Sequence, residues 1–371
     1  MTRIVRLAVL LVVAATGPAA ARQSPVAADP FSAAIASARE IVLTKVAQQR
    51  IPGYVAAVYA DGRVVWAEGF GDANVETRTP VWPSTRFRIG SVSKTFTATA
   101  LGILVEEGRL DLDAPVQRYV PSFPEKRFPI TTRQLAGHVA GIRHYRGAEF
   151  ESNRSYSSVR DALRVFEDDS LLFEPATQYS YSTYGWNLIS AIIEGASGQD
   201  FLDYMQQRVF TPLGMRHTGP DRVDSIIPLR TGYYVLRDST LVNGPFVDNS
   251  VKWAGGGFLS SAEDLLRFGV AHLEPGFLRA ETLALLQTSQ RIRDGSETNY
   301  GLGWRVWRTP QGRHAIGHTG GSMGGTTAFV VFPDERVIVA VIANMSSVRG
   351  QAQTAFEIAE LFIKREGQAI R

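Results

Sequence analysis

The chain has 371 residues, and its 39 lysines and arginines nearly balance 36 aspartates and glutamates, so the formal net charge is only +3. The basic residues are scattered, and no basic run with interleaved aromatic residues occurs, which argues against a nucleic-acid-binding protein. The absence of cysteine excludes disulfides, thiol catalysis and zinc–thiolate sites, and the six histidines form no H-E-x-x-H pattern. We therefore expect neither a metal nor a cofactor.

The first 21 residues are typical of a cleavable signal peptide. Arg3 and Arg6 precede the apolar run Leu7–Ala15, and three alanines at 19–21 offer a small-residue cleavage site. The apolar run is much shorter than the roughly 20 residues of a membrane-spanning helix, so an uncleaved anchor is the less favoured alternative. We expect a periplasmic or secreted protein whose mature chain, residues 22–371, forms one domain.

The segment after this leader predicts a helix and then a hairpin. Asp29-Pro30 is typical of an N-cap followed by a first-turn proline, and apolar residues then recur at helical spacing. These residues are Phe31, Ile35, Ala38, Val42 and Val46. Two β-rich runs in GYVAAVYADGRVVWAEGFG flank Asp61-Gly62, which is a hairpin signal.

The rest of the chain predicts helices in the middle and strands near the C-terminus. Helical stretches and long loops occupy roughly residues 95–290, whereas GLGWRVW, GRHAIGHTG, TTAFVVFP and RVIVAVIANM predict four short strands before a closing helix. The simplest packing is an α/β (α+β) fold, in which the N- and C-terminal strands form one antiparallel sheet flanked by helices. We place this sheet lobe at about 30–90 and 300–371, and an inserted, mostly helical lobe at about 91–299.

A lysine follows a serine by three residues at the start of one predicted helix. Ser91-Val92-Ser93-Lys94 contains one of only five lysines in a chain that otherwise uses arginine. Lysine can lose its proton when buried, whereas arginine cannot, and a serine hydroxyl needs a base to become a nucleophile. At helical spacing the two side chains share one face. For this motif alone, a serine N-cap with a solvated lysine is the simpler interpretation.

Two further stretches carry polar groups next to regular elements. Tyr181-Ser182-Thr183 precedes a helix, and a tyrosine near a protonated lysine is pushed toward phenolate and can act as a general base. The stretch His318-Thr319-Gly320-Gly321 ends a strand, where glycines let a substrate backbone approach and a free N–H can stabilise an oxyanion. Taken alone, aromatic packing and a glycine-rich turn explain these stretches equally well.

In chain order, the three stretches match S-x-x-K, Y-x-[NST] and [KH]-T-G, the signature set of serine penicillin-recognising enzymes. From about residue 40 onward, the chain resembles the class C β-lactamase and D-alanyl-D-alanine carboxypeptidase superfamily. The stretches GRLDLDAPVQRYVPSFPEK, GIRHY and VDNSVKWAGGGFLS resemble its mitochondrial serine β-lactamase-like branch in particular.

The resemblance implies a role for each matching residue. Ser91 would be the acylated nucleophile, Lys94 its proton partner and Tyr181 the general base. Substrate contacts would come from Thr183, His318, Thr319, Gly320 and Gly321. The N–H groups of Ser91 and Gly321 would form the oxyanion hole. The implied activity is hydrolysis of a peptide, small ester or β-lactam through an acyl-enzyme, without a cofactor.

Two departures from the pattern argue against efficient β-lactam hydrolysis. Thr183 stands where the family usually has asparagine, so one donor to a substrate carbonyl is missing. His318 stands where the β-lactamases have lysine, so we expect a cation that is only partly present at neutral pH. No E-x-x-L-N segment, the deacylation element of class A enzymes, occurs in the chain.

Two other functions are compatible with parts of the sequence. Gly320–Gly324 fits the G-x-S-x-G nucleophile elbow of α/β-hydrolases, but a strand rather than a helix is predicted after it, and no histidine follows His318. The second alternative is a covalent penicillin or peptide sensor that deacylates very slowly. The sequence leaves the substrate, its stereochemistry and the oligomeric state open.

Overall fold

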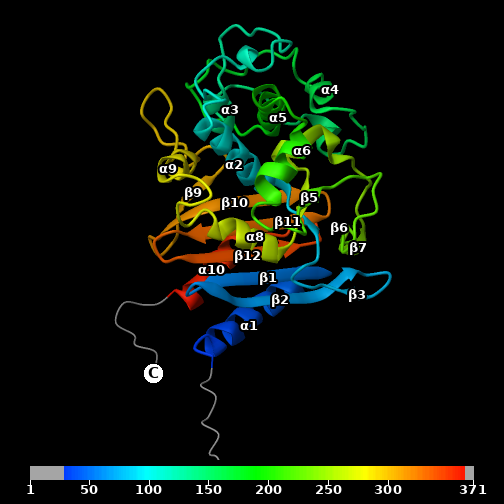
Figure 1. Cartoon of the computed structure of the whole chain (residues 1–371). Coiled ribbons are helices and arrows are strands. Elements are labelled where there is room, and N and C mark those ends of the chain that lie inside the picture. Colours follow the sequence, from blue (N-terminus) through cyan, green and yellow to red (C-terminus); the bar gives the residue numbers. More distant parts are fainter. Residues whose placement is uncertain (1–28, 364–371) are drawn as a thin grey trace, which may run out of the picture.

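Strands from the two ends of the chain form one antiparallel sheet (Figure 1). The computed structural model describes residues 29–363, and the predicted signal peptide lies outside them. Across the described sheet, the seven strands follow the order β3 (Thr79–Pro80), β2 (Arg63–Asn74), β1 (Gly53–Ala60), β12 (Val337–Ala343), β11 (Gly325–Phe332), β10 (His314–Ser322) and β9 (Arg305–Arg308). At its centre, Tyr54 of β1 pairs with Ala343 of β12. The predicted sheet of N- and C-terminal strands is therefore confirmed.

Both faces of this sheet are covered, which explains why its central strands read as continuous apolar runs. Along β1, Val55 and Ala57 join one hydrophobic core, whereas Tyr54, Ala56 and Val58 join another. This division follows from the alternation of side chains along a strand. The sheet therefore separates two cores, one on the side of the terminal helices and one on the side of the central lobe.

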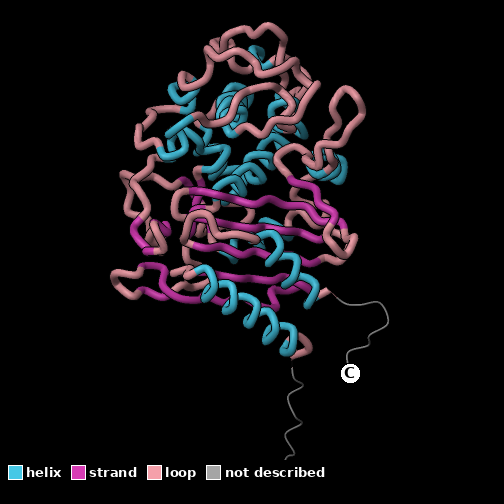
Figure 2. The backbone as a smooth tube through the Cα atoms, turned by 180° about the vertical axis from the view of Figure 1, so that it is seen from behind, coloured by secondary structure: helices cyan, strands magenta, loops and turns pink. Residues whose placement is uncertain are grey.

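The terminal helices cover one face. Helix α1 (Ser32–Gln49) and helix α10 (Gln351–Phe362) pack against each other, and Figure 2 shows them side by side across the sheet. The α1 helix starts slightly later than the sequence predicts, but Asp29 still binds the start of the segment by accepting the Phe31 N–H at 3.0 Å.

The predicted hairpin at Asp61-Gly62 is also confirmed. The two residues have φ values of 52° and 77°, which are the positive values that a type I′ turn between twisted strands requires. Asp-Gly tolerates these angles because glycine lacks a Cβ and aspartate is among the residues that enter this region most readily.

The opposite face carries the mostly helical lobe (Figure 1). Its helices are α2 (Ser93–Glu106), α3 (Thr132–Ala136), α4 (Val159–Leu163), α5 (Thr183–Ser197), α6 (Phe201–Met205), α7 (Trp253–Gly256), α8 (Ala262–Val270) and α9 (Ala280–Gln287). Short strands are β4 (Phe87–Arg88), β5 (Gly219–Pro220) and β8 (Phe258–Ser260) in one sheet, and β6 (Tyr234–Arg237) and β7 (Thr240–Asn243) in a hairpin. Within residues 29–363, no helix combines the length and apolarity needed to cross a membrane.

Helix α2 lies at the centre of this lobe. Every residue from Ser93 to Leu104 is buried, and α2 contacts α5, α7 and α9. A helix that is buried all round holds its first turn in a fixed position relative to its neighbours. That first turn follows the 3₁₀ turn η1 (Gly90–Val92), which carries Ser91.

Candidate active site

Ser91 lies where the start of α2 meets strand β10. A Cβ added at Gly90 would lie 2.5 Å from the Gly321 carbonyl oxygen, and one added at Gly320 would lie 1.8 Å from the carbonyl oxygen of Ile89. The glycines are therefore needed for the close approach of two backbones, and Gly90 also has a positive φ of 51°. The result is that the backbone of Gly321 lies beside the turn that carries Ser91.

Lys94 occupies a closed polar pocket below Ser91. Its side chain is fully buried, and Nζ donates to the Gly255 carbonyl at 2.6 Å, to Ser91 Oγ at 3.1 Å and to Thr183 Oγ1 at 3.3 Å. None of these acceptors is a carboxylate. The solvated-lysine interpretation of the S-x-x-K motif is therefore wrong for this chain.

The surroundings of Lys94 favour its neutral form. Burial lowers its pKa well below the usual value, and the nearby charges of Arg305 and Lys252 lower it further. Burial removes the ammonium from water, and like charges raise its energy, so both effects act in the same direction. A neutral amine beside the serine hydroxyl can accept its proton.

Tyr181 lies next to this pair, immediately before α5. The Lys94 Nζ is 4.8 Å from the centroid of its ring. Burial raises the pKa of Tyr181, although its hydrogen bond with Ser91 and the charge of Arg305 oppose that rise. Burial is the larger effect, so the pKa shift runs opposite to the expected push toward phenolate, and the role of Tyr181 as general base stays a prediction.

His318 is placed differently from the prediction. It is buried, Tyr300 Oη lies 2.8 Å from Nε2, and Nδ1 contacts the Thr319 carbonyl. A carbonyl only accepts, so Nδ1 carries the proton and Nε2 accepts from Tyr300. Burial lowers the pKa of His318 well below its usual value, and Lys94 and Arg305 add to this shift. The partial cation expected here is therefore absent, and both ring nitrogens are already occupied.

A different residue supplies a cation on this side of the site. Arg305 begins β9 opposite Gly317, and its guanidinium carbon lies 5.8 Å from the centroid of the Tyr181 ring. Its Nε is buried without a hydrogen-bond partner, and it forms no ion pair with a carboxylate of residues 29–363. The sequence places Arg305 inside the predicted strand GLGWRVW, but its pattern assigned this arginine no role in the site. The signal in the sequence that could have indicated a role for Arg305 was its position directly after the glycine-rich stretch GLGW.

A small cavity opens at Ser91 on the other side. Its volume is about 80 Å³. It is lined by Ser91, His144, Tyr145, Phe150, Thr183, Lys252, Gly255, Gly256, Gly321 and Ser322. The cavity wall therefore contains the predicted Ser91, Thr183 and Gly321. It also contains three aromatic side chains and Lys252, which the sequence motifs did not indicate. A larger hollow of about 790 Å³ lies next to Phe31 and Phe362, on the terminal-helix side, and contains none of the predicted site residues.

Lys252 is a second buried lysine at this cavity. Its Nζ donates to the Phe150 carbonyl at 3.1 Å and lies 4.8 Å from the centroid of the Phe150 ring. Burial lowers its pKa to about 8, with Arg88 contributing in the same direction and Asp221 and Asp248 opposing it. Lys252 therefore stays mostly protonated at neutral pH, and its charge contributes to the low pKa of Lys94.

Thr183 begins α5 and contributes to two parts of the site. Its hydroxyl accepts from Lys94, and its backbone N–H donates to His144 Nδ1 at 3.1 Å. Thr319 is partly exposed on β10, whereas Gly320 is buried against the Ser91 turn. The structure thus brings the predicted residues to one place, except that His318 offers no free group to a substrate.

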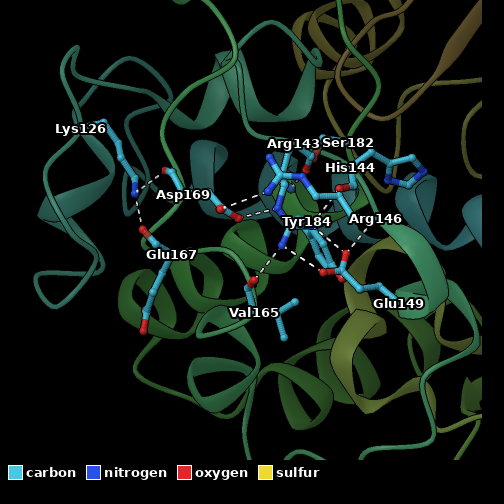
Figure 3. Close-up of polar contacts among 11 residues, drawn as sticks. Lys126, Arg143, His144, Arg146, Glu149, Val165, Glu167, Asp169, Ser182 and Tyr184 are labelled. Atoms are coloured by element: carbon cyan, nitrogen blue, oxygen red, sulfur yellow. Dashed lines mark hydrogen bonds and ion pairs between the residues drawn. The ribbon is translucent and has the colours of Figure 1, made fainter.

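The segment that carries His144 is held by a buried arginine. Figure 3 shows Arg143 between the carboxylates of Glu149 and Asp169. Its Nη1 lies 2.7 Å from Glu149, and Tyr184 of α5 donates to the same carboxylate at 2.9 Å. Buried arginine–carboxylate contacts of this kind fix side chains in one geometry. The loop is therefore attached to the helix that follows Tyr181.

The nucleophile-elbow alternative does not fit this geometry. Ser322 is the last residue of β10, and β11 begins at Gly325, so a strand follows where an elbow needs a helix. Its Oγ is buried and has no hydrogen-bond partner among the described residues. Within residues 29–363, no group of three or more His, Asp or Glu side chains is arranged to hold a metal ion.

Comparison with known proteins agrees with the geometry. A family model described as Beta-lactamase matches residues 38–361. The chain is 35% identical to the serine β-lactamase-like protein LACTB, mitochondrial, of Mus musculus, across 92% of this chain and 82% of the relative.

Two solved structures share the fold. The octameric penicillin-binding protein homologue of Pyrococcus abyssi has a TM-score of 0.77 and 29% identity, covering 89% of this chain and 78% of that one. A D-stereospecific amidohydrolase of Streptomyces has a TM-score of 0.73 and 26% identity, covering 87% of this chain and 97% of that one.

Proposed function

Since this chain belongs to the β-lactamase family and is a serine hydrolase, we propose that it cleaves an amide or ester bond through an acyl-enzyme formed on Ser91. The observation that carries the proposal is the contact between Lys94 and Ser91 Oγ at 3.1 Å, inside a pocket without carboxylates. None of the groups bonded to Lys94 carries a negative charge, so an ion pair does not explain why a lysine is buried here. Its useful property there is a removable proton.

Acylation begins with proton transfer from Ser91 to Lys94. Neutral Nζ has two protons, which serve Gly255 and Thr183, and one lone pair, which accepts the serine proton. Oγ then attacks the scissile carbonyl carbon, and the carbonyl π electrons move to its oxygen. The backbone N–H groups of Ser91 and Gly321 stabilise this oxyanion, an assignment supported by the close approach of the two backbones at Gly90 and Gly320.

Departure of the leaving group requires a proton donor. The raised pKa of Tyr181 keeps its phenol protonated, and its hydroxyl shares a hydrogen bond with Ser91. Tyr181 donates this proton to the leaving nitrogen or oxygen while the C–N or C–O bond breaks, and the Lys94 ammonium replaces it. Water then hydrolyses the acyl-enzyme by the same steps in reverse.

Arg305 and Thr319 provide the contacts for the leaving part of the substrate. The Arg305 guanidinium, which has no ion pair with a carboxylate of residues 29–363, replaces the cation that His318 lacks and suits a free carboxylate. This arrangement favours a peptide-like substrate with a terminal carboxylate, and the Streptomyces relative named as a D-stereospecific amidohydrolase supports an amide substrate of D-configuration.

The alternative is a covalent sensor with the same acylation chemistry and little turnover. Intact mass spectrometry after mixing with a D-Ala-D-Ala peptide, an activated ester or a β-lactam separates the two functions. Turnover with a transient adduct at Ser91 supports the hydrolase, and a lasting adduct supports the sensor. Ser91→Ala should form no adduct and hydrolyse none of these compounds. Wild-type turnover in that variant would contradict both functions.

We also propose that the chain is exported to the periplasm or beyond. The supporting observation is the leader-like pattern of Arg3, Arg6 and the apolar run Leu7–Ala15. The murine relative is named as mitochondrial, which would require a different route. N-terminal sequencing of the mature protein tests this proposal, since cleavage near residue 21 supports export and an intact N-terminus contradicts it.

A further inference from the structure

The acylation steps assign no role to His144, a residue of the Ser91 cavity. His144 lies in the cavity wall together with Ser91 and Thr183. It is partly buried, and its ring meets the Tyr181 ring edge-on at 5.5 Å between centroids. A histidine in this position could serve as a base, a cation or a hydrogen-bond donor, and its contacts decide among these roles.

Its tautomer is fixed by helix α5. The backbone N–H of Thr183 donates to Nδ1 at 3.1 Å, so Nδ1 is an acceptor and the ring proton lies on Nε2. Within residues 29–363, no atom forms a hydrogen bond with Nε2. Nε2 is therefore the polar atom of the ring that stays free, and His144 itself is part of the cavity lining.

The ring is also neutral at working pH. Burial and the charge of Lys94 lower the pKa of His144 to about 4; Lys252 acts in the same direction and Glu149 opposes it. Burial is the larger effect, because it withdraws the ring from water, and positive charge at either neighbouring lysine also disfavours an imidazolium. His144 is therefore a donor without a charge, and it is no general base, because its acceptor nitrogen is already used.

The neighbouring residues keep this donor in place. Arg143 is ion-paired with Glu149 and Asp169, and its carbonyl accepts the Ser182 hydroxyl at 2.7 Å (Figure 3). The hydrogen bond between Ser182 and Arg143 thus connects the residues that directly precede Thr183 and His144 in the chain. A donor held in this way loses little freedom when it binds an acceptor.

We propose that His144 donates a hydrogen bond from Nε2–H to a carbonyl oxygen in the acyl part of the substrate, and so selects acyl donors that carry an amide next to the scissile bond. This inference rests on the proposed function of Ser91. It assigns to His144 the contact that the resemblance gives to residue 183, where threonine replaces asparagine and the hydroxyl is bound to Lys94.

The test compares two esters with the same leaving group. The p-nitrophenyl ester of N-acetylglycine has an amide in its acyl part, whereas p-nitrophenyl acetate has none. In His144→Asn, Oδ1 takes the place of Nδ1 and still accepts from Thr183, but the shorter side chain leaves no donor at the position of Nε2. In His144→Gln, the side-chain amide nitrogen takes the place of Nε2 and keeps the donor.

We expect the ratio of kcat/KM for the amide-bearing ester to that for acetate to fall about five- to tenfold in His144→Asn, and by less than about twofold in His144→Gln. His314→Asn, the same change at the start of β10 outside the cavity, should leave the ratio unaltered. Thermal unfolding of each variant shows whether the fold is retained.

Three outcomes would overturn the inference. A wild-type ratio in a folded His144→Asn variant would exclude the hydrogen bond. A fall in His144→Gln as large as or larger than that in His144→Asn would show that the donor does not set the ratio, since only the glutamine variant keeps it. A wild-type protein that hydrolyses neither ester would contradict the proposed function itself, and the inference with it, whereas the first two results leave Ser91 chemistry intact.

Discussion

Replacement of Lys94 by arginine tests whether this residue acts through its proton or through its charge. Arginine keeps the positive charge, but it does not release its proton at any pH the protein tolerates. In the structure, Nζ is fully buried and bonded to Gly255, Ser91 and Thr183 at 2.6–3.3 Å. A guanidinium placed there could donate to these atoms but could not accept the Ser91 proton.

The expected loss is large. General acid–base catalysis contributes about 10²- to 10⁴-fold, so acylation in Lys94→Arg should slow by about 10³-fold, or about 4 kcal/mol in activation free energy. Lys94→Met is the matched control, because it removes both the charge and the base. If the proton is what matters, the arginine and methionine variants should be about equally slow.

The assay is single-turnover acylation by p-nitrophenyl acetate, followed between pH 6 and 10. In the wild type, the rate should rise with pH as Lys94 loses its proton, and level off well below pH 10.5 because burial and the charges of Arg305 and Lys252 lower its pKa. The arginine variant should show no such rise. A folded arginine variant that acylates within a few-fold of wild type would refute the reasoning and leave Lys94 an electrostatic role only.

Three further predictions concern neighbouring residues. Arg305→Met should raise KM roughly 10- to 100-fold for a peptide with a free C-terminal carboxylate, because a charge-assisted hydrogen bond is lost. The KM for the same peptide with a C-terminal amide should rise much less. Equal effects on both peptides would contradict the proposal that Arg305 binds the carboxylate. Thr183→Asn should raise kcat/KM for nitrocefin relative to an ester, because the amide offers two donors and further reach; an unchanged or lower ratio would count against it. His272 is buried with a pKa of about 4, against about 6.5 when unfolded, so between these values only the unfolded chain binds the proton and stability falls as pH falls. Between pH 7 and 4.5, the free energy of unfolding measured with urea should therefore fall by about 2–3 kcal/mol less in His272→Leu than in the wild type. The same pH dependence in both proteins would show that this histidine does not cause the loss.

Much of the fold is readable from the sequence because local and tertiary preferences agree. The Asp61-Gly62 turn, the apolar runs of β1 and β12 and the helical period of α1 each predict the element that forms. Local sequence patterns do not determine which face of the sheet each segment covers. That depends on pairings such as Tyr54 with Ala343, which are remote in sequence.

The site was only partly readable for a related reason. Motif spacing indicates Ser91 and Lys94 because they lie on one helical turn, and the structure places them in contact. The protonation of Tyr181 and His318 depends on burial, which no motif reveals, and both differ from expectation. Arg305 reaches the site from a strand whose register is set by the sheet.

The pairing of β1 with β12 also constrains how the protein is made. The central strand pair of the sheet joins residues nearly three hundred positions apart, so it cannot form until the ribosome has synthesised the chain as far as Ala343. Before that moment, β1 has only the β2 hairpin as a partner, and its second edge is open. Closing such a long loop carries an entropic cost that the local contacts of the hairpin cannot offset. Nascent chains shortened at the C-terminus should therefore lack the completed sheet, and the Ser91 turn would lose the β10 backbone against which it is positioned.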